Sequence, residues 1–458
     1  MNIEMIEQGL FQLTLLLWGG PLLILLIGTG VYLTFILRGM QFRYLKYALF
    51  QVFAPHKKDA EGDIGHFQAL MTTLAGAIGT GSIVGISTAI TIGGLGSLFW
   101  MWVTAIFGMA TKYAESLLAV KYRVVDKNGE MVGGPMEYIE RGLGWRSVSI
   151  FFSLAGCIAA ITTGNLVQSN AIAEAVNSIW TVNPWVSGIL IASIVSLVII
   201  GGVKSIGRVA GVLVPFMALF YILGGLFILL LHYDQIPHAL SLIFASAFKG
   251  QAAVGGFAGS SVMVAIQMGV SRSVFSSEAG FGISSIAAAA AKTDSAGRQG
   301  MITMTGALFS TLIVCSITGL VIAVTGFLGK PAANGEQLNG ATLAIAAFSS
   351  VVSGGKYIVS IGLLLFAFST ILAWAYYGEK CCEYLFGEKS VFYYRIIYTL
   401  AIIPGAAINL SIVWFLADIC NAFMVVPNLI ALIALARVIK SETQEFLVLA
   451  DAEAVTKA

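Results

Sequence analysis

The sequence predicts an all-α polytopic membrane protein with 11 transmembrane helices, and three observations support this fold class. Hydrophobic residues make up 58% of the 458 residues and charged residues only 10%, whereas soluble domains have about 45–50% and about 25%. Eleven apolar stretches each approach the roughly 20 residues that a helix needs to cross a bilayer. Lys and Arg gather in alternate loops between these stretches. A net charge of +2 argues against a nucleic-acid partner.

The expected spans follow one another through mostly short loops. They cover residues 10–37, 67–92, 96–122, 147–177, 184–202, 207–232, 252–275, 299–328, 354–384, 394–410 and 412–436. The first is not a cleaved signal peptide, because Glu4 and Glu7 precede it without any Lys or Arg. With the N-terminus outside, 22 of the 25 Lys and Arg lie in inner loops, and Lys249, Lys330 and Lys356 lie outside. This predicts a multi-pass protein of the cell membrane with a cytoplasmic C-terminus.

The segments between the spans are expected to be short. Residues 41–52 alternate basic and apolar side chains, which predicts an amphipathic helix on the inner face. Short helices are also expected over 137–144 and 236–249, and a frayed polar tail over 451–458. The five cysteines lie in apolar runs without metal-ligand spacing, so neither a disulfide framework nor a zinc site is expected.

Two spans carry glycine-rich interruptions. The second contains Gly76, Gly79 and Gly81 at mid-depth within the run AGAIGTGS of residues 75–82. Non-helical backbone at that depth is tolerated only where it is buried in protein or lines a wet cavity. The alternative is close helix packing through small residues. The seventh span is similarly interrupted at residues 267–269 (QMG), after the glycine-rich residues 255–261.

The positions of these interruptions predict a transporter built from an inverted repeat. One broken span near the start of each half of a ten-helix unit is typical of such proteins, with the binding site where the broken helices meet. The whole chain would form one transporter domain. It would comprise an extra N-terminal helix (10–37), a first repeat (67–232), a second repeat (252–436) and a cytoplasmic tail (437–458).

Polar residues inside other spans mark further candidates. Thr162, Asn165 and Ser169 share one face of the fourth span with Gln168 beside them. On the ninth span, Phe366, Thr370, Trp374 and Tyr377 form a stripe with Ser369 adjacent. Both faces could equally pack against neighbouring helices.

The few charges inside the spans are interpreted as structural. Glu115 and Glu174 lie near span ends, Asp418 belongs to the last span, and Arg272 is expected to anchor the inner face. The four histidines lie in loops or at span ends, which excludes a bis-histidine haem. No nucleophile–base pair lies within the spans, so an enzyme is not expected.

Three motifs resemble one known family. Residues 79–123 (beginning GTGSIVGIST), 133–144 (GGPMEYIERGLG) and 269–291 (GVSRSVFSSEAGFGISSIAAAAA) are similar to the alanine/glycine:cation symporters. Members usually have Asn, Gly and Asn where Ser82, Ser273 and Ser277 stand. The resemblance covers nearly the whole chain. It implies the amino acid–polyamine–organocation superfamily and the leucine-transporter fold, with the second to eleventh spans as ten core helices.

The resemblance also implies a sodium site. Its ligands would be the carbonyls of Ala75, Ile78 and Phe366 with the hydroxyls of Ser369 and Thr370. All five are oxygens, the ligand type that a hard cation requires. No organic cofactor is expected, and sodium would be the coupling ion.

An amino-acid zwitterion needs partners for both of its charges. N–H groups around Gly79, Thr80 and Gly81 would face the carboxylate at the start of a half-helix. Carbonyls near 265–267, with Asn165 or Gln168, would accept the ammonium hydrogens. The expected substrate-binding residues are therefore Gly79, Thr80, Gly81, Asn165, Gln168, Gln267, Met268, Thr370 and Trp374. Trp374 and Met268 would close the space that a longer side chain needs.

The expected function is sodium-coupled symport of alanine and glycine by alternating access. Sodium is favoured over protons because the sixth span has no buried Lys that could replace the ion. Open alternatives are a proton-coupled symporter, a symporter for serine, and a passive channel. A channel would show polar residues along a continuous path, whereas here they cluster at mid-depth. A redox-complex subunit would show membrane histidines, which the spans lack.

Overall fold

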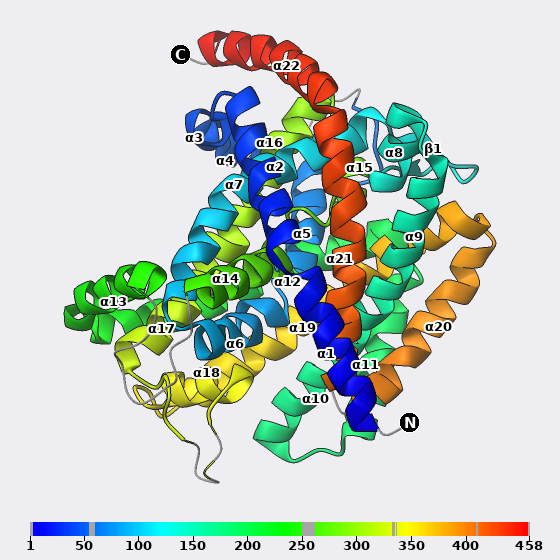
Figure 1. The fold of residues 1–458 in the computed structure, drawn as a ribbon. Coiled ribbons are helices and arrows are strands. Elements are labelled where there is room, and N and C mark those ends of the chain that lie inside the picture. Colours follow the sequence, from blue (N-terminus) through cyan, green and yellow to red (C-terminus); the bar gives the residue numbers. More distant parts are fainter. Residues whose placement is uncertain are drawn as a thin grey trace.

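The computed structural model describes residues 3–54, 60–249, 262–331, 335, 337–408 and 411–456 as a helical bundle with one small β-hairpin (Figure 1). The chain starts with α1 (Ile3–Leu17), α2 (Gly20–Ile36), α3 (Met40–Arg43) and α4 (Leu45–Phe53). The first half of the bundle contains α5 (His66–Ala77), η1 (Thr80–Ser82), α6 (Val84–Gly93), α7 (Gly96–Lys121), β1 (Val124–Val125), β2 (Met131–Val132), α8 (Pro135–Leu143), α9 (Arg146–Ile161), η2 (Thr162–Leu166), α10 (Val167–Trp180), α11 (Pro184–Ile199) and α12 (Gly202–Leu231).

The second half continues after a short peripheral segment. It contains η3 (Tyr233–Gln235), α13 (Ile236–Lys249), α14 (Val262–Ser277), α15 (Ser285–Ala289), α16 (Ala296–Ala307), η4 (Leu308–Cys315), α17 (Ser316–Thr325), α18 (Gly340–Ser349), α19 (Gly355–Phe386), α20 (Ser390–Gly405), α21 (Ser411–Ala434) and α22 (Ala436–Thr456). The antiparallel hairpin pairs Val124 with Val132. Part of the seventh expected span, 252–261, lies outside the described residues.

Five helical stretches in the described ranges are long and apolar enough to cross a membrane. They are residues 146–180, 202–231, 296–325, 355–386 and 412–434. Large apolar side chains on outer helices are exposed, for example Leu197 (76%), Val212 (75%) and Phe392 (65%). Exposed apolar faces of this extent suit lipid rather than water. The chain is therefore a multi-pass membrane protein.

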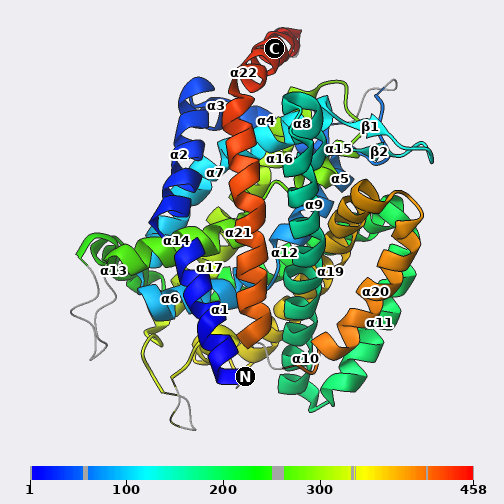
Figure 2. The same cartoon turned by 45° about the vertical axis from the view of Figure 1, so that its right-hand side comes forward.

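The core is organised around α19 and α7. Helix α19 buries Phe366, Trp374 and Tyr377 and packs against α5, α9, α10 and α12. Helix α7 packs against α14 and α16. Helices α11 and α20 lie side by side at the edge of the bundle (Figure 2). The most buried helices thus belong to both halves of the chain.

Two sequence expectations need correction. The first expected span is two helices, because α1 ends at Leu17 and α2 begins at Gly20, with Pro21 in its first turn. Residues 451–456 are not frayed but belong to α22. This helix buries Phe446 and Ala450 and lies across one end of the bundle (Figure 1).

Candidate functional site

The first expected break is confirmed. Helix α5 ends at Ala77, and helix α6 starts at Val84 after the short η1 turn. Between them, Ile78 (φ −86°, ψ 76°) and Gly79 (φ −117°, ψ −154°) leave the helical conformation. All residues from 75 to 82 are buried. The backbone polar groups of an interrupted helix are therefore available inside the protein, where only other protein groups or a ligand can bind them.

The second break lies farther along the chain than the sequence indicates. Residues 267–269 are not interrupted but lie within helix α14, which ends at Ser277. Gly269 serves close packing instead, because a Cβ there would lie 2.6 Å from the Ser97 carbonyl oxygen. The chain leaves the helix at Glu278 (φ 57°), Gly280 (φ 97°) and Gly282 (φ 74°). These left-handed conformations favour glycine and make Glu278 a backbone outlier.

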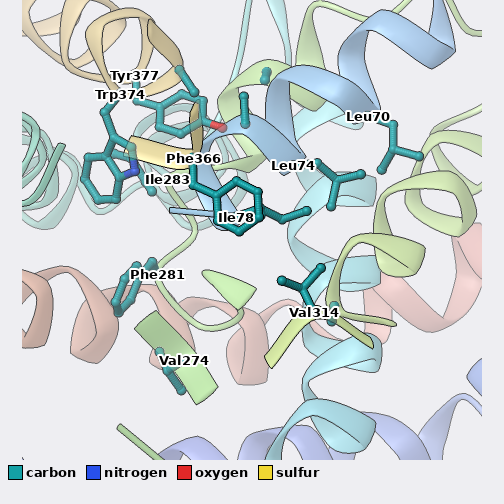
Figure 3. Packing of buried hydrophobic residues seen from close by; sticks show 14 of the residues in the cluster. Leu70, Leu74, Ile78, Val274, Phe281, Ile283, Val314, Phe366, Trp374 and Tyr377 are labelled. Carbon is teal, nitrogen blue, oxygen red and sulfur yellow. The ribbon is translucent and has the colours of Figure 1, made fainter. Parts of the chain in front are cut away.

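The two breaks lie against each other. A Cβ on Gly81 would lie 2.7 Å from Phe275 Cδ1, and a Cβ on Gly76 would lie 2.9 Å from Glu278 Oε1. Both positions therefore require glycine, because a larger residue would prevent the two segments from approaching each other this closely. Figure 3 shows Ile78 from the first break, Ile283 from the second break, and Phe366 and Trp374 of α19 within one buried hydrophobic cluster.

Oxygens from α5 and α19 converge at the first break. The Thr370 hydroxyl donates to the carbonyls of Ala75 and Phe366, both at 2.9 Å. The Ser369 hydroxyl donates to the same carbonyls at 3.3 Å and 2.9 Å. Four of the five expected sodium ligands are thus in one cluster. The fifth, Ile78, is close to it, because a Cβ on neighbouring Gly79 would lie 2.5 Å from Thr370 Oγ1.

Gln168 reaches the first break from α10, whereas Asn165 turns away from it. Gln168 Oε1 accepts a hydrogen bond from the Thr80 amide at 3.3 Å, and its Nε2 donates to the Thr80 hydroxyl at 3.1 Å. The Asn165 amide instead donates to the Tyr398 carbonyl of α20 at 2.5 Å. Asn165 lies in the π-helical segment η2, a local geometry common at functional sites, and Gln168 lies in the first turn of α10 that follows it.

Trp374 forms an enclosed wall beside the breaks. A Cβ on Gly164 would lie 2.2 Å from Trp374 Cβ, so the indole packs directly on η2. Its ring centroid lies 5.9 Å from that of Tyr377, and the residue is 2% exposed. Trp374 is therefore held between η2 and Tyr377 in the buried core.

Gln267 and Met268 lie on the wall of a separate cavity of about 290 Å³. The Gln267 amide donates to the Trp18 carbonyl at 3.1 Å. The same cavity is lined by Arg272 and Asp418, which pair across α14 and α21 at 3.4 Å. Arg272 is therefore not the inner-face anchor expected from the sequence. Because Gln267 and Met268 belong to the continuous α14, the structure does not place them in the second break.

Three charged groups lie at the second break: Glu115, which the sequence analysis interpreted as structural, and Lys112 and Glu278, which it did not single out. Glu115 Oε1 accepts hydrogen bonds from the amides of Gly280 and Gly282 at 2.9 and 3.1 Å, and from Asn428 Nδ2 at 2.8 Å. The Lys112 ammonium donates to the Ser277 carbonyl at 2.5 Å. Glu278 is buried in the break itself. Two sequence features could have indicated these groups. One is the acidic Glu278 within SSEAGFG, and the other is the i, i+3 spacing of Lys112 and Glu115 on α7.

One arginine joins the two broken helices at the end of the bundle near α8. Arg123 Nη1 donates to the carbonyls of Ala289 and Ala291 at 3.0 and 2.9 Å, and Nη2 donates to the Glu61 carbonyl at 2.9 Å. Bridges pair residues 61 and 64 with 293 and 291. Nearby, burial raises the pKa of Asp63, although the Met131 amide donates to that carboxylate at 2.7 Å.

A second charged group at the same end is centred on Lys380. Its ammonium is 2% exposed and pairs with Glu383 at 2.9 Å and Glu130 at 3.0 Å. Glu130 lies beside the hairpin, whereas Glu383 and Lys380 belong to α19. This ion-pair group therefore ties the end of α19 to the loop that follows α7.

Two adjoining helix breaks inside a bundle are typical of the class of transporters with the leucine-transporter fold. A solved structure supports this fold: that of MhsT in complex with L-phenylalanine superposes with a TM-score of 0.56 at 14% sequence identity. The match covers 84% of this chain and 99% of that one.

The chain belongs to the sodium:alanine symporter family, which it matches over residues 3–457. It is 50% identical to the sodium/alanine symporter AgcS of Methanococcus maripaludis over 94% of each chain. It is 33% identical to the amino-acid carrier protein AlsT of Bacillus subtilis, over 90% of this chain and 86% of that one. The protein is therefore a secondary amino-acid symporter.

Proposed function

We propose that the protein couples the uptake of small neutral amino acids, alanine and glycine, to sodium by alternating access. The observation that carries this proposal is the shared use of the Ala75 and Phe366 carbonyls by the hydroxyls of Ser369 and Thr370. Four oxygens from two helices thus lie within hydrogen-bonding distance of one another. A sodium ion takes such neutral oxygens as ligands, and rotation of the two hydroxyl protons away frees them for the ion.

The substrate is proposed to bind where the two breaks meet. The amides of Gly79 and Gly81 are candidates for its carboxylate, whereas the Thr80 amide already donates to Gln168. Carbonyls of the second break, rather than those near 265–267, are candidates for the ammonium. Trp374, held against Gly164, is proposed to restrict the site to small side chains. The name of the relative AgcS supports alanine as the substrate.

Coupling follows because sodium and substrate use the same non-helical segment. An ion that orders residues 75–81 lowers the cost of ordering them for the substrate, and each ligand raises the affinity of the other by an equal factor. The proposed topology has 11 spans, an inverted repeat over 67–232 and 252–436, and an outer N-terminus. The two chain ends at opposite ends of the bundle (Figure 1) support this arrangement.

The test is uptake of labelled alanine into liposomes that contain the purified protein. A sodium gradient is expected to drive saturable accumulation that glycine competes with and leucine does not. Uptake driven by a pH gradient in potassium alone would refute sodium coupling. Absence of saturable uptake in any salt would favour a channel.

Two variants locate the ion. Ser369→Ala and Thr370→Ala are each expected to raise the sodium concentration for half-maximal uptake at least about tenfold, because each removes a ligand. Thr325→Ala is the matched control, since among the described residues its hydroxyl bonds to the carbonyls of Val321 and Ile322 in its own helix. Equal sodium dependence in all three variants would contradict the proposed site.

A further inference from the structure

Glu278 places an unsatisfied carboxylate at the start of the second break. The residue is 1% exposed, and neither of its oxygens accepts a hydrogen bond within the described part of the chain. The Trp374 indole N–H interacts with this carboxylate, although no hydrogen bond of ordinary geometry reaches either oxygen from the described residues. Burying an acidic group with so few partners is costly. Its retention in a left-handed backbone conformation points to a functional reason.

The carboxylate lies against the last turn of α5. A Cβ on Gly76 would lie 2.9 Å from Glu278 Oε1 and 3.0 Å from the Tyr377 hydroxyl oxygen. Gly76 directly follows Ala75, whose carbonyl belongs to the proposed sodium site. The C-terminal end of a helix also carries a partial negative charge. Glu278 therefore concentrates negative charge beside the group of neutral oxygens.

The other charges at this break do not fully balance Glu278. Lys112 donates to the Ser277 carbonyl, and Glu115 carries a second carboxylate that bonds to Gly280 and Gly282. Two carboxylates and one ammonium carry a net charge of −1 when all are ionised. All three side chains are buried, so an additional cation would complete the balance.

We propose that Glu278 is the counter-charge of the transported sodium ion: it attracts the ion electrostatically to the neighbouring oxygens without being a ligand. This inference rests on the proposed function. The ligands of the site are neutral, so the charge of the ion must be compensated from its surroundings. A unit charge beside Gly76, the neighbour of the proposed ligand Ala75, changes ion affinity by at least about tenfold at an effective dielectric constant near 20.

The test compares sodium dependence in full-length variants reconstituted into liposomes. Glu278→Gln keeps the shape and removes the charge, so the sodium concentration for half-maximal alanine uptake is expected to rise at least about tenfold. Uptake at saturating sodium and alanine is expected to stay within about twofold of wild type. Sodium-dependent thermal stabilisation of the purified protein should shift to higher sodium in parallel. Glu174→Gln, a carboxylate on α10, is the matched control.

Three results would overturn the proposal. The first is an unchanged sodium midpoint in a folded Glu278→Gln protein. The second is loss of maximal uptake at an unchanged midpoint, which would indicate a structural role. If Glu278→Gln does not fold, Glu278→Asp is measured instead. This variant keeps the charge, so its sodium midpoint should stay within about threefold of wild type. A sodium midpoint about tenfold higher in Glu278→Asp is the third result. If wild-type uptake itself ignores sodium, the proposed function fails instead.

Discussion

A methyl group added at Gly79 should weaken sodium binding through one identifiable atom. The new Cβ of Gly79→Ala would lie 2.5 Å from Thr370 Oγ1, so an ordinary contact of 3.4 Å requires a shift of about 0.9 Å. The hydroxyl now lies 2.9 Å from two carbonyl oxygens. A shift of that size carries it beyond hydrogen-bonding distance from at least one of them.

The expected loss follows from the displaced hydroxyl oxygen, which would no longer reach the ion together with the two carbonyls. A hydrogen-bond-like contact with a charged group is worth about 1.5–3 kcal/mol, so sodium affinity should fall roughly 10- to 160-fold. The assay is the sodium concentration that gives half-maximal alanine uptake. Gly28→Ala on α2 is the control, because a Cβ there meets no atom within 4 Å.

A double-mutant cycle separates this mechanism from a general distortion. In a Thr370→Ala background the atom that the new methyl meets is gone, so Gly79→Ala should cost much less sodium affinity than it does in the wild type. Equal losses in both backgrounds would refute the reasoning. An unchanged sodium midpoint in the single variant would refute it as well.

Three further predictions concern stability and packing. Lys380→Met leaves two carboxylates without their cation and should destabilise the protein by about 3–5 kcal/mol; an unchanged thermal unfolding midpoint would contradict this. Arg123→Lys keeps the charge but loses the forked guanidinium that bonds to three carbonyls. Amide hydrogen exchange should therefore rise at 61–64 and 289–291 and stay unchanged elsewhere. Equal protection in both proteins would argue against Arg123 acting as a clamp between these segments. Gly164→Ala sets a Cβ 2.2 Å from Trp374 Cβ and should cost about 1–3 kcal/mol through overpacking, seen as reduced thermal stability; wild-type stability would mean that α19 moves freely.

The sequence located one helix break and missed the other for a physical reason. Three glycines within 76–81 weaken the helix at mid-span, and the chain does break there. Gly269 looks equally disruptive in sequence, but it lets α14 approach the Ser97 carbonyl. Only the partner helix distinguishes a glycine for packing from one with positive φ, such as Gly280.

Contacts between distant segments explain the remaining differences. The face shared by Asn165 and Gln168 was visible, but which of them reaches Thr80 depends on how α10 turns at η2. Glu278 appeared in a motif without a role, because its neighbour Gly76 lies about 200 residues earlier in the chain. The oxygen cluster of Ser369 and Thr370 was predicted from the family resemblance, because residue spacing alone does not indicate it.

The Arg123 clamp has a consequence for sequence variation. Its three acceptors are main-chain carbonyls, which every residue type carries, so the contact is indifferent to the side chains at 61, 289 and 291. Random substitution at those positions should be tolerated as far as the clamp is concerned. The clamp itself therefore depends on one side chain, and a mutational scan should find intolerance at 123 for this reason, whereas intolerance at the fully buried Ala289 and Ala291 would reflect packing.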